Sequence, residues 1–141
     1  MNTMPEKFHN KTDIAYLAGL FDGEGCVTFK KYPKNYKRKS GKIDRYKTWS
    51  IRLEVSMTDK HVIEYIQKVL NVGTVTSRKP HHTSMGIRMQ WRWRCTHRQA
   101  YKVCSLFYPY SIVKKEKHKS IIDHYEKKVV DINEYKKASN G

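Results

Sequence analysis

The chain has 141 residues, and its 29 lysines and arginines against 13 acids give a formal net charge of +16. This length fits one domain, and a hydrophobic content of 38% supplies a single core but nothing larger. No apolar run reaches the ~20 residues of a membrane span. A charge of this size usually indicates a nucleic-acid partner and less often an acidic membrane surface, and the alternative is a soluble protein that merely happens to be basic.

A helix is expected first, from Thr12 or Asp13 as its N-cap to Gly23 and Gly25, where the chain can leave the helical conformation. The segment CVTFKKY then alternates with the period of a strand. Residues 33–47 are turn-rich and very basic, and we expect them to form a connection. The next segment, TWSIRLEVSM, alternates apolar and polar residues as a half-buried antiparallel strand does.

The second half of the chain repeats this alternation of helix and strand. The expected elements are a capped helix over 58–70, a short strand over 71–79, a turn over 80–86, a strand over 87–95, helical material over 97–107 and a helix over about 114–129. The polar tail over 130–141 is expected to fray. The prediction is one domain, residues 1–141, with its core over about 12–129.

The element order is α-β-β-α-β-β-α-α, which predicts an α+β fold with a four-stranded antiparallel sheet. Each strand has only one apolar face, so all helices should cover the same side of the sheet. The opposite face is basic, rich in hydrogen-bonding groups and nearly free of aliphatic side chains. Its members are Lys30, Tyr32, Arg52, Glu54, Ser56, Thr74, Thr76, Arg78, Arg88, Gln90, Arg92 and Arg94.

A face of this kind suits the bases and phosphates of a DNA groove, because a β-ribbon fits the major groove. Arginines would favour guanine and Gln90 adenine. Lys34 begins the basic connection, which is expected to hold phosphates. The alternative is an ordinary solvated sheet face, but such faces usually mix glutamate with lysine, whereas one strand here alternates arginines with a glutamine.

Small residues lie along one side of the first helix. Ala15, Gly19 and Gly23 are spaced at i, i+4 and i+8, with Ala18 beside them. Small residues in a row allow a second helix to approach closely. The chain offers no second helix of this kind, so we expect the partner to be another copy of the same chain.

An acid, Glu24, follows at the C-terminal end of that helix, where the macrodipole is negative. A second copy would bring a second Glu24 nearby, and divalent cations would offset the repulsion. Carboxylate oxygens and a helix-end carbonyl are ligands suited to Mg²⁺. The alternative is a solvated glutamate at a helix end.

The cysteines and histidines give no sign of a metal cage. Cys26, Cys95 and Cys104 are odd in number and have no CxxC spacing, and the seven histidines include no HxxxH pair. Neither a disulfide framework nor a zinc site is expected, and the N-terminal residues do not resemble a secretory signal. We therefore expect an intracellular, reducing compartment, which could be a bacterial or phage cytoplasm or an organelle.

The stretch LAGLFDGEG at Leu17–Gly25 resembles the motif that names the LAGLIDADG homing endonucleases. The element order and the basic sheet over about 12–125 look like that family's saddle-shaped DNA-binding fold. The chain departs from the usual motif at Phe21, at Gly23 and at Glu24, where the family usually has aspartate. The longer Glu24 side chain could shift the geometry of a bound metal.

The resemblance implies roles for individual residues. Glu24 would bind the catalytic metal together with a backbone carbonyl, here that of Gly23, while Asp22 would be structural. Asp59 matches a residue that orients water near the metal, although it could equally be a helix N-cap. Lys115 best matches a lysine that supports catalysis. Lys117 is second, and a phosphate contact or a solvated position is the alternative for both.

One motif in a chain of this length implies a homodimer that cuts a long, roughly palindromic duplex with Mg²⁺. Mn²⁺ is a plausible substitute, and Ca²⁺ is expected to permit binding without efficient turnover. The implied partners are double-stranded DNA and a second copy, with no membrane and no small-molecule substrate. An intron RNA maturase and an inactive DNA-binding regulator on the same scaffold remain as alternatives; a basic ribosome-associated protein would explain the charge but not the small residues.

Overall fold

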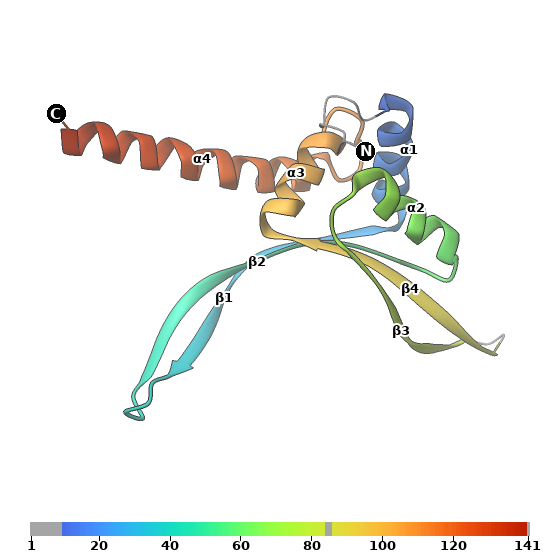
Figure 1. The fold of residues 1–141 in the computed structure, drawn as a ribbon, viewed down its shortest axis with the longest axis horizontal. Helices are drawn as coiled ribbons and strands as arrows, with labels where there is room; N and C mark the ends of the chain where they lie inside the picture. Colours follow the sequence, from blue (N-terminus) through green and yellow to red (C-terminus); the bar gives the residue numbers. More distant parts are fainter. Residues whose placement is uncertain (1–9, 84–85, 141) are drawn as a thin grey trace, which may run out of the picture.

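The computed structural model of the chain describes residues 10–83 and 86–140, with side chains described over 10–77 and 88–127 (Figure 1). The chain folds into eight elements in the predicted order. They are α1 (Lys11–Glu24), β1 (Gly25–Lys37), β2 (Ile43–Met57), α2 (Lys60–Leu70), β3 (Thr74–Thr83), β4 (Gly86–Thr96), α3 (His97–Phe107) and α4 (Lys115–Asn140). The predicted α+β class is confirmed.

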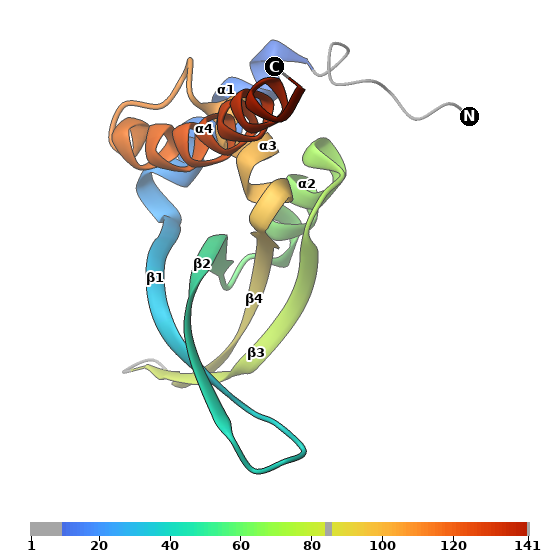
Figure 2. The same cartoon turned by 90° about the vertical axis from the view of Figure 1, so that its left-hand side faces the viewer.

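The four strands form one antiparallel sheet in the order β1-β2-β4-β3. All four helices lie on the same side of this sheet, and its two hairpins curve away from them in opposite directions (Figure 1). The view turned by 90° shows the other side of the sheet free of helices (Figure 2). The sheet therefore has the predicted saddle shape, with one covered and one open face.

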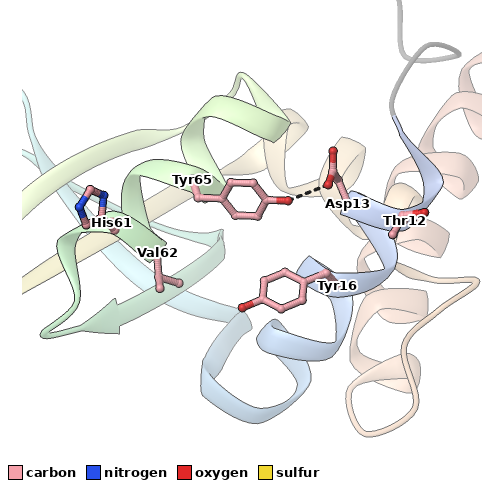
Figure 3. Close-up of a pocket in the computed structure, with 6 residues that line it drawn as sticks. All are labelled: Thr12, Asp13, Tyr16, His61, Val62 and Tyr65. Carbon is pink, nitrogen blue, oxygen red and sulfur yellow. Dashed lines mark hydrogen bonds between the residues drawn. The ribbon is translucent and has the colours of Figure 1, made fainter.

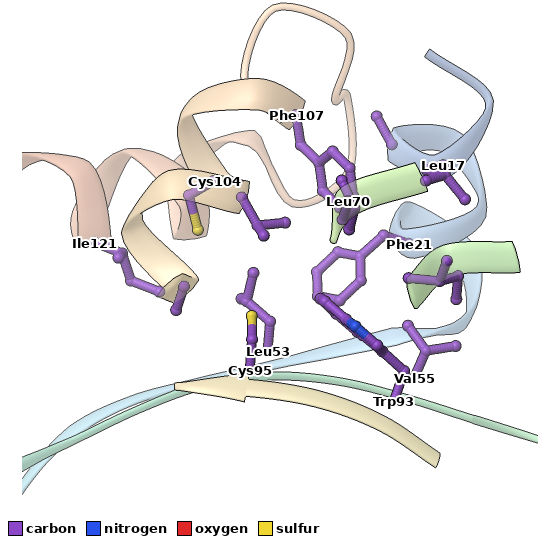
Figure 4. Packing of buried hydrophobic residues seen from close by; sticks show 14 of the residues in the cluster. Leu17, Phe21, Leu53, Val55, Leu70, Trp93, Cys95, Cys104, Phe107 and Ile121 are labelled. Carbon is purple, nitrogen blue, oxygen red and sulfur yellow. The ribbon is translucent and has the colours of Figure 1, made fainter. Parts of the chain in front are cut away.

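The core lies between the middle of the sheet and the helices (Figure 4). In β2, Ile51, Leu53 and Val55 are buried, whereas the residues between them are only half-buried. Trp93 and Cys95 of β4 are buried in the same layer. The alternation follows from strand geometry, in which successive side chains point to opposite faces.

The first hairpin is longer than the sequence predicts. In place of a connection over 33–47, β1 and β2 stay paired from Gly25 opposite Val55 to Lys37 opposite Ile43. The prediction relied on apolar alternation, which is not needed here because residues 31–43 are exposed. In the outer hairpin β1 and β2 pair only with each other, and the backbone groups that point away from the partner strand are left to solvent.

Two further boundaries differ from the prediction. Strand β3 continues to Thr83 through most of the expected turn, whose residues 84–85 lie outside the described part of the chain. Helix α4 continues to Asn140 through the tail that was expected to fray. Residues 130–140 of that tail, VDINEYKKASN, contain neither proline nor glycine, and their composition is compatible with a helix. Among the described residues, no helix is both long and apolar enough to cross a membrane.

Helix α1 begins two or three residues earlier than predicted. Its N-cap is Asn10, whose side-chain oxygen accepts from the Thr12 N–H at 2.8 Å. Asp13, one of the two predicted caps, instead accepts a hydrogen bond from the Tyr65 hydroxyl of α2 at 2.8 Å. The helix ends at Glu24, and the backbone N–H of Gly25 closes it on the carbonyl of Phe21.

Replacing Gly25 by alanine is expected to lower the free energy of unfolding by about 1–3 kcal/mol, the usual cost of overpacking. A Cβ at this position would lie 2.3 Å from Cδ2 of the buried Phe21 ring. Gln99→Ala is the control, because Gln99 is exposed on α3 (His97–Phe107), away from α1. Urea unfolding measures both variants, and an equal loss in the two would contradict the packing argument.

Candidate active site and nucleic-acid face

Glu24 occupies the last position of α1, immediately before the sheet begins at Gly25. Its side chain is exposed and makes no hydrogen bond or ion pair with another described residue. The last carbonyls of a helix have no partner within the helix, so Glu24 adds a carboxylate to an end that is already negative. An unpaired acid in this place is suited to a cation.

The metal site predicted at Glu24 and Gly23 has carboxylate and carbonyl donors of the right chemistry. Gly23 is exposed beside Glu24. Within the described part of the chain, no three His, Cys, Asp or Glu side chains are grouped to hold a metal ion. One chain thus contributes a fraction of a ligand set, and further oxygen donors would have to come from elsewhere.

Asp22, the first acid of the motif, is structural, as the resemblance implied. Its carboxylate accepts from the Ser111 hydroxyl and from the backbone N–H groups of Ile112 at 2.7 Å, Val113 at 3.0 Å and Lys114 at 3.2 Å. Burial raises the pKa of Asp22, but these hydrogen bonds outweigh it and lower the pKa to about 2. The ionised side chain therefore ties α1 to the segment before α4.

A lysine that the sequence analysis did not name lies at this end of α1. The ammonium of Lys114 donates to the backbone carbonyl of Asp22 at 2.5 Å. The predicted Lys115 instead lies with its ammonium 4.8 Å from the centre of the Tyr108 ring, and Lys117 is exposed. The sequence analysis missed Lys114 because four lysines within the six residues 114–119 leave spacing alone unable to select one.

Asp59 is the N-cap of α2, and its carboxylate accepts from the Val62 N–H at 3.4 Å. The capping role that the sequence left open is therefore present. The second role, orienting water near a metal, stays a prediction.

The stripe of small residues on α1 is open at Gly19 and Gly23. Both are exposed, and a Cβ at either position would meet nothing within 4 Å. Ala15 is half-buried. Ala18 was also predicted for the interface, but this is wrong: it is fully buried in the chain's own core, because it shares the helix face of Ile14 and Phe21.

A groove of about 480 Å³ lies beside the N-terminal half of α1, between this helix and α2 (Figure 3). Tyr16, which is 57% exposed, meets the ring of Tyr65 edge-on at 6.1 Å between ring centres. Tyr16 is three residues before Gly19 and so lies on the same side of the helix. The sequence analysis did not include it in the stripe.

The open face of the sheet carries the residues predicted to contact DNA. Six are exposed and six are half-buried, whereas the side chain of Arg78 lies outside the described part. The exposed ones are Lys30, Tyr32, Lys34, Thr74, Thr76 and Arg88, and the half-buried ones are Arg52, Glu54, Ser56, Gln90, Arg92 and Arg94.

Strand register aligns these side chains in rows. One row crosses all four strands, from Cys26 through Glu54 and Arg94 to Thr74. The exposed Cys26 is on this face although it was not predicted as a contact. Glu54 is also not a free acceptor, since three arginines surround it: Arg92 and Arg94 at 3.2 Å and Arg52 at 3.7 Å.

The sequence analysis also did not single out His118 of α4, which is buried. It is completely buried between the rings of Phe21 and Phe107, with Nδ1 3.3 Å from Sγ of Cys104. Its Nε2 is buried and has no hydrogen-bond partner among the described residues. Burial lowers the pKa of His118 to about 4.

The free energy of unfolding is expected to fall as the pH drops from about 6.5 to about 4. In this range His118 binds a proton in the unfolded chain, where its pKa is about 6.5, but stays neutral in the folded chain, where its pKa is about 4. The shift is worth about 3 kcal/mol at about 1.4 kcal/mol per pKa unit. Urea midpoints at pH 7, 5.5 and 4 measure it. In His118→Leu this part of the slope should disappear; an unchanged slope would contradict the assignment to His118.

A profile of the family described as LAGLIDADG endonuclease matches residues 17–139. The homing endonuclease I-CvuI, solved in complex with its target, is 23% identical, with a TM-score of 0.54 over 79% of this chain and 64% of its own. I-TnaI, another homing endonuclease, is 20% identical, with a TM-score of 0.53 over 77% of this chain and 67% of its own. I-LtrWI, solved bound to target DNA, is 21% identical, with a TM-score of 0.56 over 89% of this chain and 39% of its own.

At these identities the solved structures show a shared fold. The chain spans 64% of the length of I-CvuI, less than two thirds of that protein. The profile match, in contrast, extends over most of the chain and includes the motif from Leu17 to Gly25. The chain belongs to the LAGLIDADG endonuclease family.

Proposed function

We propose that this protein is a site-specific endonuclease that cuts both strands of duplex DNA as a homodimer with Mg²⁺. The observation that carries the proposal is the position of Glu24. Glu24 is exposed, has no partner among the described residues, and lies where the open stripe of α1 meets the first strand of the basic sheet. The proposed subunit contact, cation site and DNA surface would therefore meet at the junction of α1 and β1.

The dimer in this proposal forms through α1. Gly19 and Gly23 allow the α1 helix of a second copy to approach their backbone, and the two helix ends would then lie together at the two-fold axis. Two Glu24 side chains would face each other across that axis. A two-fold protein favours a roughly palindromic target.

The open sheet face would lie in the major groove. Each subunit would cover about one helical turn, so the dimer would cover on the order of 20 bp at about 10–10.5 bp per turn. The lysines of the outer hairpin, such as Lys34, would contact phosphates, and affinity would fall steeply with salt. The half-buried arginines in the middle of the face would read guanine. Solved relatives support a DNA partner, since I-CvuI and I-LtrWI were each crystallised with their targets.

At the axis, Glu24 and the carbonyl of Gly23 would hold the cation against the scissile phosphate. Bound Mg²⁺ supplies a Lewis acid that activates water and offsets charge on the leaving 3′ oxygen. Asp22 keeps Ser111–Lys114 against the end of α1, so that the Lys114 ammonium stays near the same helix end. Asp59 would orient water, and Lys115 would support the reaction from the first position of α4. By analogy with the family, cleavage leaves short 3′ overhangs.

The nature of the cation also has support from a relative. I-CvuI was solved with its target in the presence of 2 mM Ca²⁺, and with another target in the presence of 2 mM Mg²⁺, where the DNA was not cleaved. For the present chain, we propose Mg²⁺ as the working ion and Mn²⁺ as a substitute. Ca²⁺ would allow binding without efficient turnover.

Cleavage selection tests the proposal. The full chain is mixed with a randomised duplex library in Mg²⁺, with a parallel sample in Ca²⁺, and the cut ends are sequenced. Defined ends around a near-palindromic site are expected in Mg²⁺ only. Enrichment of bound duplexes without cut ends would contradict the nuclease and support a DNA-binding regulator. Preference for structured intron RNA over every duplex would instead support a maturase.

A further inference from the structure

The arginine cluster in the middle of the open sheet face has a single acid at its centre. We infer that Glu54 is a positioning residue, which holds the guanidinium groups of Arg92 and Arg94 for recognition of guanine without itself contacting DNA. The inference rests on the DNA-binding part of the proposed function.

The contacts come from strand register. Strand β2 places Glu54 directly opposite Arg94 on β4, and Arg92 is two residues along the same face. Oε1 of Glu54 lies 3.2 Å from Nη1 of Arg92 and 3.2 Å from Nη2 of Arg94. Oε2 lies 3.7 Å from Nε of Arg52. Both carboxylate oxygens are thus engaged by cations.

The cluster is shielded enough for these contacts to matter. The side chain of Glu54 is 17% exposed, that of Arg92 26% and that of Arg94 32%. Ion pairs that are partly withdrawn from water are screened less than exposed pairs. A carboxylate at this depth can hold side chains that would otherwise sample many rotamers on an open surface.

The cluster also has more donors than the protein satisfies. Three positive side chains meet one negative one, and each guanidinium has five N–H donors against the two oxygens of a carboxylate. The Nε atoms of Arg52, Arg92 and Arg94 are buried and have no hydrogen-bond partner among the described residues. Because the donors outnumber the carboxylate oxygens, the Nη donors that do not contact Glu54 are left for an incoming acceptor, such as O6 and N7 of guanine.

Glu54 would act in two ways on specificity. Bidentate recognition of guanine requires the fork of an arginine to stand in a fixed orientation, which the ion pairs provide. The negative charge also reduces the attraction of the cluster for phosphates, which carry no sequence information. A direct contact between Glu54 and the N4 amino group of cytosine is the competing role.

The test compares Glu54→Gln with Asp44→Asn. Asp44 is ten residues away on the same strand and, because β1 and β2 pair without interruption, lies on the same face, where it contacts one arginine, Arg38. Both substitutions remove one negative charge. Randomised duplexes are selected for binding in Ca²⁺, affinity for a random duplex is measured against salt, and urea midpoints report folding.

Preference for guanine at the positions read by Arg92 and Arg94 is expected to fall roughly tenfold in Glu54→Gln. Affinity for random duplex should rise about twofold at low salt in both variants, since each loses one negative charge that repels phosphates. Asp44→Asn should keep the guanine preference of the wild type. A structural role alone would lower the urea midpoint of Glu54→Gln and weaken all sequences alike.

Several results would overturn the inference. An unchanged guanine preference in folded Glu54→Gln contradicts positioning, and a loss confined to one cytosine shows a direct base contact instead. If Glu54→Gln does not fold, Arg94→Lys replaces it: this variant keeps the charge but loses the fork, and an unchanged preference contradicts the inference. If the wild-type protein selects no sequence, the proposed function and this inference are both contradicted. If the wild type selects a sequence and Glu54→Gln keeps the same guanine preference, only this inference is contradicted.

Discussion

Glu24→Gln is expected to lower the rate of DNA cleavage by about 100- to 1,000-fold, the scale seen when a group that stabilises transition-state charge is removed. The substitution keeps the shape of the side chain but removes the charge that would hold the cation. Binding in Ca²⁺ should weaken little, because affinity comes mainly from contacts between basic side chains and phosphates. Folding should not change, since Glu24 is exposed and unpaired among the described residues.

Single-turnover cleavage of the selected target measures this effect. Glu64→Gln is the control, because Glu64 is an exposed acid on α2 whose ion pair with Lys60 is also exposed. Such a pair contributes little to stability, so this variant should cut as the wild type does. Cleavage by Glu24→Gln at the wild-type rate would remove Glu24 from the proposed site.

Gly19→Leu and Gly23→Leu are expected to separate the proposed dimer into folded monomers. Within one chain nothing lies within 4 Å of a Cβ at either position, so leucine can be accommodated on the surface. Leucine also favours a helix over glycine by about 0.5–1 kcal/mol, so the monomer should be as stable as before or more so. The dissociation constant of the dimer should rise by at least about 100-fold, equivalent to about 3 kcal/mol.

Sedimentation velocity over a range of concentrations measures this change. Gln99→Leu on α3 is the control, because it adds the same side chain at an exposed position away from the stripe. Cleavage should be lost together with dimerisation, since one chain would supply only one Glu24. If the glycine variants remain dimers with wild-type affinity, the interface lies elsewhere on the molecule.

The covered half of this fold could be predicted from local patterns. In β2 the alternation of Ile51, Leu53 and Val55 with polar residues identifies both the strand and its buried face, because side chains alternate across a sheet. The apolar positions of α2 identify its buried side in the same way, and Ile63, Ile66 and Leu70 are all buried. These patterns can be read from the sequence because buried positions are apolar and recur every second residue in a strand and about every 3.6 residues in a helix.

The unpredicted features depend on contacts between distant parts of the chain. Asp22 meets Ser111, 89 residues away, and this pairing is not visible in either segment alone. Glu54 was predicted as one polar residue among many, but register with β4 makes it the centre of three arginines. Ala18 was assigned to the partner-facing side because small size alone does not show which neighbour requires it.

The outer part of the β1–β2 hairpin contributes no side chain to the core, since residues 31–43 are all exposed. Substitutions there should rarely unfold the protein, because surface changes usually alter stability by less than about 0.5 kcal/mol. The folded body and the far end of the proposed DNA surface can therefore change independently. If the proposed function holds, changes at the hairpin tip could alter the target, in evolution or in an engineered library, without first having to restore the stability of the protein.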